Sequence, residues 1–200
     1  MAAPGADQSA QTVVAIASSA GGITALKAVI EALPADFPAA VLVVQHLDPA
    51  SQSQLAQILQ RHSAVPVVEA TEGAHLEPGH VYIAPPGHHL VVSAEATLHL
   101  SDTPLRNFVR PSADELFESV AARFEGHAVA VVLTGTGIDG SVGTLAVQVQ
   151  GGTVVVQDPE TSEFPGMPRA AIRAGAVTKV VPLGQIAGTL VAMLATERTP

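Results

Sequence analysis

Short runs of apolar residues alternate along the chain with stretches in which apolar residues recur every three or four positions. Runs that are apolar throughout are typical of parallel β-strands buried on both faces. The predicted strands of this kind are Val13–Ala17, Ala40–Val44, Ala128–Leu133, Thr153–Val156 and Val177–Val181. Because helical periodicity separates most of them, the pattern predicts a doubly wound α/β fold, a mostly parallel sheet with helices on both faces.

Four of the predicted helices carry an apolar stripe that we expect to face the core. The stripes are Ile23, Leu26, Ile30 and Leu33; Leu55, Ile58 and Leu59; Leu116, Phe117, Val120 and Phe124; and Val142, Leu145 and Val149. Ser112 and Glu115 have the spacing of a capping box, which predicts the start of the third helix. A short helix is expected to end at Arg173 and a last one to begin at Gly184.

Residues 66–100 have a different texture, with a β-rich run at Val81–Ala84 and a Pro-Pro-Gly turn after it. Two further β-rich runs, Leu90–Val92 and Thr97–Leu100, predict an antiparallel hairpin near one edge of the sheet.

A chain of 200 residues is long enough for one domain with a sizeable core. We expect this domain at residues 12–195, a flexible leader at 1–11 and a tail at 196–200.

The composition restricts the classes of function. Hydrophobic residues make up 48% of the chain and charged residues 14%, yet no apolar run is long enough to cross a bilayer, so we expect a cytoplasmic protein without membrane insertion. The net charge of -9 and only nine scattered Lys and Arg residues argue against nucleic-acid binding and favour a protein or small-molecule partner. The absence of cysteine excludes disulfides, thiolate nucleophiles and cysteine-based zinc sites.

The first predicted strand ends in the tight turn Ser18-Ser-Ala-Gly-Gly22, followed at once by a helix. Such a turn exposes a hydroxyl, and the free N–H groups of the helix start attract an anion or an oxyanion. His46 follows the second strand and Asp139 follows the strand that ends at Leu133. Ligands of doubly wound folds bind at the carboxyl ends of the strands, so these side chains predict a serine nucleophile, a base and an orienting carboxylate.

Alternative interpretations stay open at this point. The turn could be a phosphate-binding turn or a plain connection from strand to helix, and His46 could merely cap the second strand. Asp139 could be the N-cap of the next helix. Asp48 is a rival for the carboxylate, although it more simply begins a turn with Pro49.

Among the other polar residues, His88 and His89 follow a Pro-Gly turn, and His89 is a candidate substrate contact. Arg106 and Arg110 flank the loop before the predicted capping box, and Arg110 is a candidate for contact with a carboxylate or an acidic surface. A solvated loop charge is the simpler interpretation of both arginines. The remaining histidines lack paired metal-ligand spacing, so no metal site is expected.

Several ordered motifs together resemble the catalytic domain of the chemotaxis protein-glutamate methylesterase (CheB) family over about residues 13–194. The matching pieces are Ala15–Gly22, Val44–Leu47, Pro78–Pro85, Arg110–Asp114, Leu133–Gly140 and Gly166–Arg169. By this resemblance the nucleophile is Ser19, the base is His46 and the orienting carboxylate is Asp139.

The resemblance implies hydrolysis of glutamate γ-methyl esters on the cytoplasmic helices of chemoreceptors, with release of methanol and with glutamine deamidation as a related activity. It requires no metal or organic cofactor. Backbone donors for the oxyanion are expected at Ala20 and in the loop of Gly135, Thr136 and Gly137.

The sequence departs from the family at three positions close to these motifs. Ala20 stands where the family usually has Thr, Thr136 where it has Met, and Val109 where a His is common. The usual N-terminal receiver domain is not among these residues, so a separate receiver domain or kinase is a candidate partner. Two alternatives are a non-catalytic regulatory or sensor-associated module of the same fold, and a hydrolase of another ester.

Overall fold

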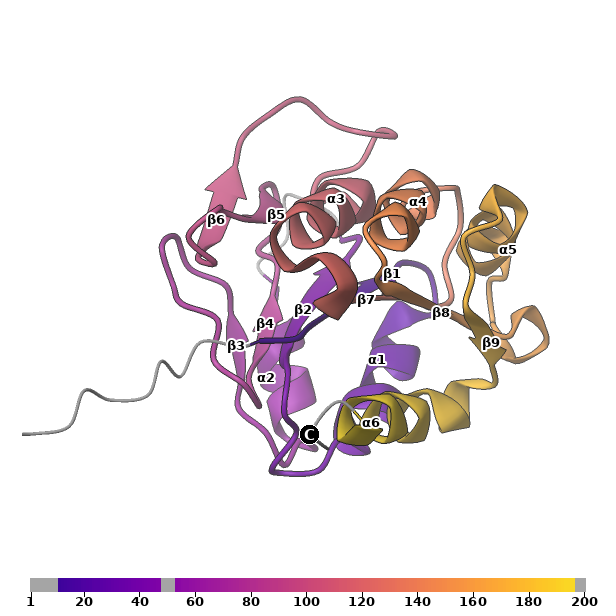
Figure 1. Cartoon of the computed structure of the whole chain (residues 1–200), viewed down its shortest axis with the longest axis horizontal. Helices are drawn as coiled ribbons and strands as arrows, with labels where there is room; N and C mark the ends of the chain where they lie inside the picture. Colours follow the sequence, from indigo (N-terminus) through magenta and orange to yellow (C-terminus); the bar gives the residue numbers. More distant parts are fainter. Residues whose placement is uncertain (1–10, 48–52, 197–200) are drawn as a thin grey trace, which may run out of the picture.

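The computed structural model describes residues 11–47 and 53–196, and these form a seven-stranded parallel sheet with a separate two-stranded hairpin (Figure 1). The sheet order is β3 (Val67–Glu69), β4 (Val81–Ile83), β2 (Ala40–Gln45), β1 (Val13–Ser18), β7 (Ala128–Val132), β8 (Thr153–Gln157) and β9 (Lys179–Val181). The predicted doubly wound fold is therefore confirmed.

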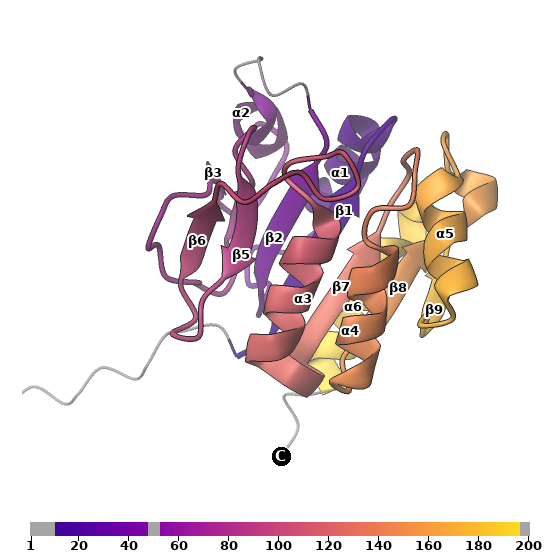
Figure 2. The same cartoon turned by 90° about the horizontal axis from the view of Figure 1, so that it is seen from above.

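Helices cover both faces of the sheet, as Figures 1 and 2 show from two directions. One face carries α1 (Gly22–Glu31), α2 (Leu55–Gln60) and α6 (Ile186–Thr196). The other face carries α3 (Ala113–Phe124), α4 (Ser141–Val149) and α5 (Gly166–Ala174). Short 3-10 turns lie at Glu125–His127, Pro159–Thr161 and Leu183–Gln185.

Burial on both faces explains why the strands are apolar throughout. In β1, Val13, Ala15 and Ala17 pack into the core beneath α3, whereas Val14 and Ile16 pack into the core beneath α1. All six residues of β1 and of β2 are buried. The two-residue period of a strand thus supplies apolar side chains to both cores at once.

The predicted antiparallel hairpin consists of β5 (His89–Val92) and β6 (Leu98–Ser101). It forms a sheet of its own, and Leu90 and Leu98 belong to the core cluster that also includes residues of α3. The short edge strand β3 lies within residues 66–100, and the sequence pattern did not predict this strand.

The predicted stripe of α4 is wrong, and that of α1 is wrong at one position. Val142, Leu145 and Val149 are exposed in α4, and the buried residues of that helix include Gly143 and Thr144. A Cβ added at Gly143 would lie 2.6 Å from the Cβ of Phe117, so α4 approaches α3 through small residues rather than through an apolar stripe. Ile23 in α1 is likewise exposed, while Leu26, Ile30 and Leu33 are buried as predicted.

β1 lies at a topological switch point, because the next strands of the chain are added on one side of it and the later strands, from β7 onward, on the other. β2 lies on one side of β1 and β7 on the other. Sites of doubly wound folds form outside the carboxyl ends of the strands at such a point.

Within the described residues no helix is long and apolar enough to cross a membrane. The expected leader and tail fall, except for Gln11 and Thr196, outside the described residues.

Candidate active site

The ends of β2, β1 and β7 bring Ser19, His46 and the loop at 133–140 together at one edge of the sheet. Ser18 pairs with Gln45 in the register of β1 and β2, so Ser19 and His46 are the next residues on neighbouring strands. The His46 N–H donates to the Ser18 carbonyl at 3.1 Å, and the Ser19 N–H donates to the Thr134 carbonyl at 3.1 Å. The backbone itself therefore fixes where these side chains begin.

The two adjacent serines have different environments. Ser18 is fully buried, and its Oγ donates to Gln45 Oε1 at 2.7 Å. Ser19 is partly exposed, and no group in the described part of the chain forms a hydrogen bond with its Oγ, the imidazole of His46 included. Of the two hydroxyls, only that of Ser19 is free to react with a bound molecule.

Gln45 links the two strand ends. Its Nε2 donates to the Ser19 carbonyl at 2.9 Å and to the His46 carbonyl at 3.0 Å, while its Oε1 accepts from Ser18. A Cβ added at Gly22 would lie 2.1 Å from Gln45 Oε1, so the amide occupies space that only a glycine leaves open. The sequence predicted no role for Gln45, which lies within the family motif Val44–Leu47.

His46 contacts Asp139, as the sequence predicted for adjacent strand ends. His46 Nε2 lies 2.9 Å from Asp139 Oδ2, and the side chains are only 12% and 4% exposed. A proton shared with a carboxylate belongs on Nε2, which leaves the lone pair of the neutral ring on Nδ1. The rival carboxylate Asp48 lies outside the described residues.

Asp139 also caps the start of α3. Its Oδ2 accepts from the Ala113 N–H at 2.6 Å, and its Oδ1 accepts from Ser112 Oγ at 2.7 Å. Burial by itself would raise the pKa of Asp139, but the hydrogen bonds from His46, Ala113 and Ser112 outweigh it and lower the pKa to about 2. The carboxylate is therefore ionised at neutral pH and can stabilise a charged imidazole.

The predicted capping box at Ser112 and Glu115 is wrong. Ser112 is the N-cap residue of α3, but its side chain caps no N–H of its own helix and donates instead to Asp139. The cap comes from a distant loop. Asp139 in turn is not the N-cap of α4, because that position belongs to Gly140.

A second carboxylate, Asp114, completes the network. It is fully buried, its Oδ1 accepts from the Gly143 N–H at 2.7 Å, and burial raises its pKa. The Nδ2 group of Asn107 donates to Asp114 Oδ2 at 2.8 Å and to Asp139 Oδ1 at 3.2 Å. One amide thus bridges two neighbouring carboxylates. No spacing in the sequence pointed to Asn107, because it lies in an irregular loop.

The four predicted oxyanion positions divide into two groups. The Gly135 N–H donates to the Phe164 carbonyl at 2.8 Å, so Gly135 is wrong as an oxyanion donor. Its role is close packing, since a Cβ at Gly135 would lie 2.8 Å from the Cβ of Ser19. The N–H groups of Ala20, Thr136 and Gly137 have no partner within the described residues and remain candidates.

The two predicted substrate contacts also differ. His89 is fully buried, its Nδ1 accepts from the Ser112 N–H at 3.1 Å and its Nε2 donates to the Pro104 carbonyl at 3.1 Å. With both ring nitrogens engaged, it holds the loop before α3 and is wrong as a substrate contact. Arg110 lines a pocket beside His46, and its Nη1 donates to the carbonyls of Asp102 and Thr103.

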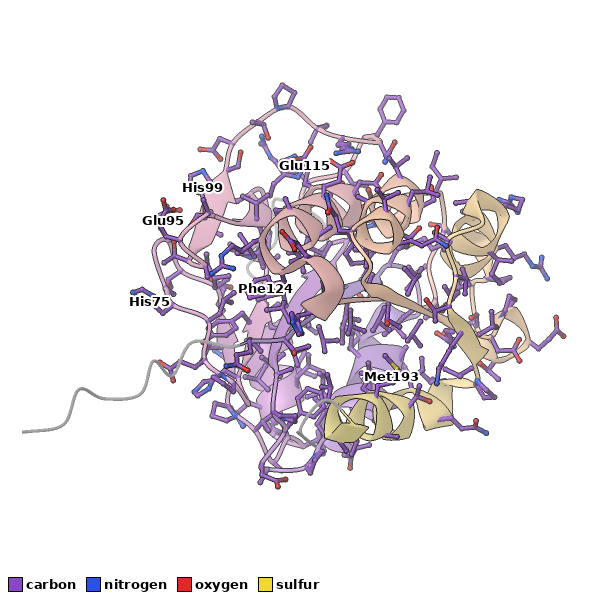
Figure 3. The ribbon with its side chains drawn as sticks, in the orientation of Figure 1. His75, Glu95, His99, Glu115, Phe124 and Met193 are labelled. Atoms are coloured by element: carbon purple, nitrogen blue, oxygen red, sulfur yellow. The ribbon has the colours of Figure 1, made fainter. Side chains whose placement is uncertain are left out.

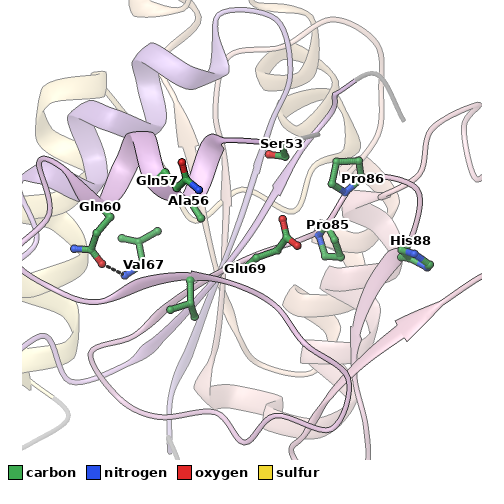
Figure 4. Close-up of a pocket in the computed structure, with 10 residues that line it drawn as sticks. Ser53, Ala56, Gln57, Gln60, Val67, Glu69, Pro85, Pro86 and His88 are labelled. Atoms are coloured by element: carbon green, nitrogen blue, oxygen red, sulfur yellow. Dashed lines mark hydrogen bonds between the residues drawn. The ribbon is translucent and has the colours of Figure 1, made fainter. Parts of the chain in front are cut away.

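The pocket beside His46 has a volume of about 180 Å³. Its lining is His46, Leu47, Gly87, Leu105, Phe108, Val109, Arg110 and Pro111. A larger open groove of about 880 Å³ lies between α2, β3 and the turn at Pro85 and Pro86 (Figure 4). Because none of Ser19, His46 and Asp139 lines that groove, the smaller pocket is the one that belongs to the candidate active site.

The other histidines give no sign of a metal centre. His80, His88 and His99 lie within 4 Å of the carboxylates of Glu77, Asp102 and Glu72, respectively. Figure 3 shows His75 and His99 on the side of the molecule that carries β5 and β6. The described residues contain no group of three or more His, Cys, Asp or Glu placed to hold a metal ion.

Comparisons with known proteins agree on one family. The family model described as CheB methylesterase matches residues 14–190. The protein-glutamate methylesterase/protein-glutamine glutaminase 3 of Burkholderia orbicola is 44% identical over 184 residues, which are 92% of this chain and 54% of the relative. The corresponding protein 1 of Bordetella avium is 42% identical over 187 residues, 94% of this chain and 55% of the relative.

The fold agrees as well. The crystal structure of the Thermotoga maritima CheB methylesterase catalytic domain superimposes with a TM-score of 0.88 at 37% identity, covering 91% of this chain and 98% of that chain. The chain spans about half the length of the curated relatives it matches.

Proposed function

Because the chain belongs to the CheB methylesterase family, we propose that it is a serine esterase that hydrolyses glutamate γ-methyl esters in chemoreceptors. The observation that carries the proposal is the His46–Asp139 pair, 2.9 Å apart, beside a partly exposed Ser19 with an uncommitted hydroxyl. Deamidation of glutamine is proposed as a second activity of the same site, since relatives carry both activities in their names.

In the proposed reaction Ser19 Oγ attacks the ester carbonyl while His46 Nδ1 accepts its proton. Asp139 holds the Nε2 proton and stabilises the imidazolium, for which its carboxylate must stay ionised; a pKa of about 2 ensures this. The imidazolium then protonates the departing methoxide, which leaves as methanol. Water, deprotonated by the same imidazole, hydrolyses the acyl-enzyme and regenerates Ser19.

Charge on the carbonyl oxygen develops next to the turn between β1 and α1. The N–H groups of Ala20, Thr136 and Gly137 are the proposed donors, since each is left without a partner in the described chain. A glutamine side chain offers the same carbonyl with ammonia as the leaving group. The proposed reaction uses no metal or organic cofactor.

The proposed partner is the methylated cytoplasmic helical region of a chemoreceptor or a related protein, with no nucleic acid and no membrane insertion. A cytoplasmic location is part of this proposal, because that is where such helices lie. A receiver domain or a kinase is proposed as the regulatory partner.

A serine-reactive phosphonate tests the assignment of the nucleophile. We expect Ser19 to be labelled, Ser19→Ala to abolish labelling and His46→Ala to reduce its rate by at least about a thousandfold. Ser18→Ala is the matched control: it removes the neighbouring hydroxyl and its bond to Gln45, and labelling of Ser19 should survive.

The same variants are then assayed for methanol release from a methylated receptor fragment. Retention of hydrolysis by Ser19→Ala, or labelling of Ser18, contradicts the proposal. Labelling of Ser19 with turnover of only generic esters would indicate a hydrolase of another ester, and absence of both labelling and hydrolysis would indicate a non-catalytic module.

A further inference from the structure

The loop between β6 and α3 has a strained tip. Arg106 and Val109 exchange two backbone hydrogen bonds of 3.2 and 3.0 Å, which close a two-residue turn at Asn107 and Phe108. Both residues have positive φ, 52° for Asn107 and 64° for Phe108. Turns of this kind favour Asn followed by Gly, because a bulky side chain is strained in the left-handed region. Asn107 fits this preference, and Phe108 departs from it.

Asn107 and Phe108 differ in what their side chains contact. The amide of Asn107 bridges Asp114 and Asp139, so this residue has a role within the chain. Phe108 is 96% exposed and buries almost none of its ring. Figure 1 shows the loop projecting beyond α3 and α4. Backbone strain of this kind clusters at active sites and in loops that bind ligands.

Four exposed apolar side chains lie on the two loops and the helix start beside the candidate active site. We call them the apolar rim; they are Leu105, Phe108, Ile138 and Val142, which are 58%, 96%, 57% and 51% exposed. The hydrogen bond from Asn107 to Asp139 joins the two loops that carry most of it. Leu105 and Phe108 also line the 180 Å³ pocket beside His46, so the rim continues directly into that pocket.

Resting on the function proposed above, we propose that Phe108 is a docking anchor for the substrate protein. Its ring packs against the apolar face of the helical segment that carries the ester. A segment covering the rim would bring a side chain into the pocket beside His46. Arg106 is engaged by Glu118 through two hydrogen bonds, and Arg110 donates to the carbonyls of Asp102 and Thr103, so the contact made by Phe108 is hydrophobic rather than ionic.

Binding and kinetics of variants that accept positive φ test the proposal. Phe108→Gly and Phe108→Asn remove the ring but suit the turn, and neither should lower the melting temperature. Each should weaken binding of the Ser19→Ala protein to a methylated receptor fragment about tenfold, the loss typical of an aromatic anchor. Phe108→Tyr should bind within about twofold of the parent protein, since it keeps the aromatic surface.

In hydrolysis, kcat/KM for the receptor fragment should fall mainly through KM. The fall should be at least about five times larger than for a blocked glutamate γ-methyl ester, which is too small to cover the rim. Val149→Ala is the matched control, because Val149 is 80% exposed at the opposite end of α4 and should change neither constant.

Equal losses on the two substrates, or an unchanged dissociation constant, overturn the role of Phe108. Failure of the proposed function is a separate result, recognised by hydrolysis that does not depend on Ser19 or by the absence of hydrolysis. The binding comparison still decides the role of Phe108 in that case.

Discussion

Ser18 and Ser19 are alike in sequence, and their hydrogen bonds decide their roles. The Ser18 hydroxyl is buried and donates to Gln45, whose amide also donates to the carbonyls of Ser19 and His46. Spacing along the chain could not distinguish the two hydroxyls, because both lie at the end of one strand. In the sequence, only the resemblance to a family motif distinguishes Ser19 from Ser18.

The position of Gln45 depends on the glycine at position 22. In Gly22→Ala the new Cβ would lie 2.1 Å from Gln45 Oε1, so the amide must move and lose its bonds to the Ser19 and His46 carbonyls. We expect kcat/KM to fall by at least about tenfold, since small displacements of a nucleophile and a base are costly. Ester hydrolysis with a urea unfolding curve measures the effect.

Gly188→Ala controls for the general cost of adding a methyl group. Gly188 lies in α6 with nothing within 4 Å of its added Cβ, so activity should be unchanged and stability equal or slightly higher. If Gly22→Ala is as active as Gly188→Ala, Gln45 does not position the two strand ends.

At the scale of elements, two carboxylates link the starts of α3 and α4. Asp139, which precedes α4, caps the first N–H groups of α3, and Asp114 in the first turn of α3 accepts from Gly143 in the first turn of α4. Each carboxylate lies near the partial positive charge of a helix start. This reciprocal capping joins two helices that pack through Gly143 without a wide apolar stripe.

Asp114→Ala should therefore cost more than the loss of an ordinary surface charge. It leaves the Gly143 N–H without its partner and removes the shorter of the two Asn107 hydrogen bonds, and we expect the free energy of unfolding at pH 7 to fall by about 1–3 kcal/mol. Glu115→Ala is the matched control, because it removes a neighbouring charge whose only ion pair within the described residues is with Arg106, and it should cost under about 0.5 kcal/mol. Urea unfolding compares the two variants, and equal costs would show that the reciprocal cap contributes nothing.

The strands were predictable because their apolar runs are unbroken, and helix α3 because its stripe is wide. The α4 stripe failed for a physical reason: the buried contact with α3 uses Gly143 and Thr144, which carry little hydrophobic signal. The start of α3 at Ser112 was predicted correctly, but its capping box was not, because the cap is supplied by Asp139, 26 residues away along the chain from Ala113. Local patterns cannot reveal partners that only the folded chain brings together.

At the scale of the whole molecule, the parallel sheet brings Ser19, His46 and Asp139 to one edge although they are far apart in the sequence. This convergence was predictable, since every parallel strand ends at the same edge. Asn107 and Asp114 were not, because a loop and a helix carry them, and no rule fixes where a loop folds back.

The ionised state of Asp139 links the site to the stability of the fold in acid. A carboxyl group whose pKa falls from 3.8 to about 2 on folding stabilises the protein above pH 4, by on the order of 2 kcal/mol, and loses this contribution as the pH drops toward 2. We expect Asp139→Asn to be less stable than the parent at pH 7, with a difference that shrinks between pH 4 and pH 2. Urea titrations across this range measure it.

Glu95→Gln is the control for the loss of a carboxylate, since Glu95 is exposed and its substitution should change the stability at pH 7 by under about 0.5 kcal/mol. A difference between Asp139→Asn and the parent that stays constant from pH 7 to pH 2 would contradict the lowered pKa.

The double role of Asp139 has a consequence for heating. The carboxylate that holds the first turn of α3 is also the one that orients His46, so fraying of that single turn removes the partner of the base while the sheet is still intact. Catalytic competence should then vanish some degrees below the cooperative melting of the domain. The proposed esterase would be inactive in partly opened molecules and active only in fully closed ones.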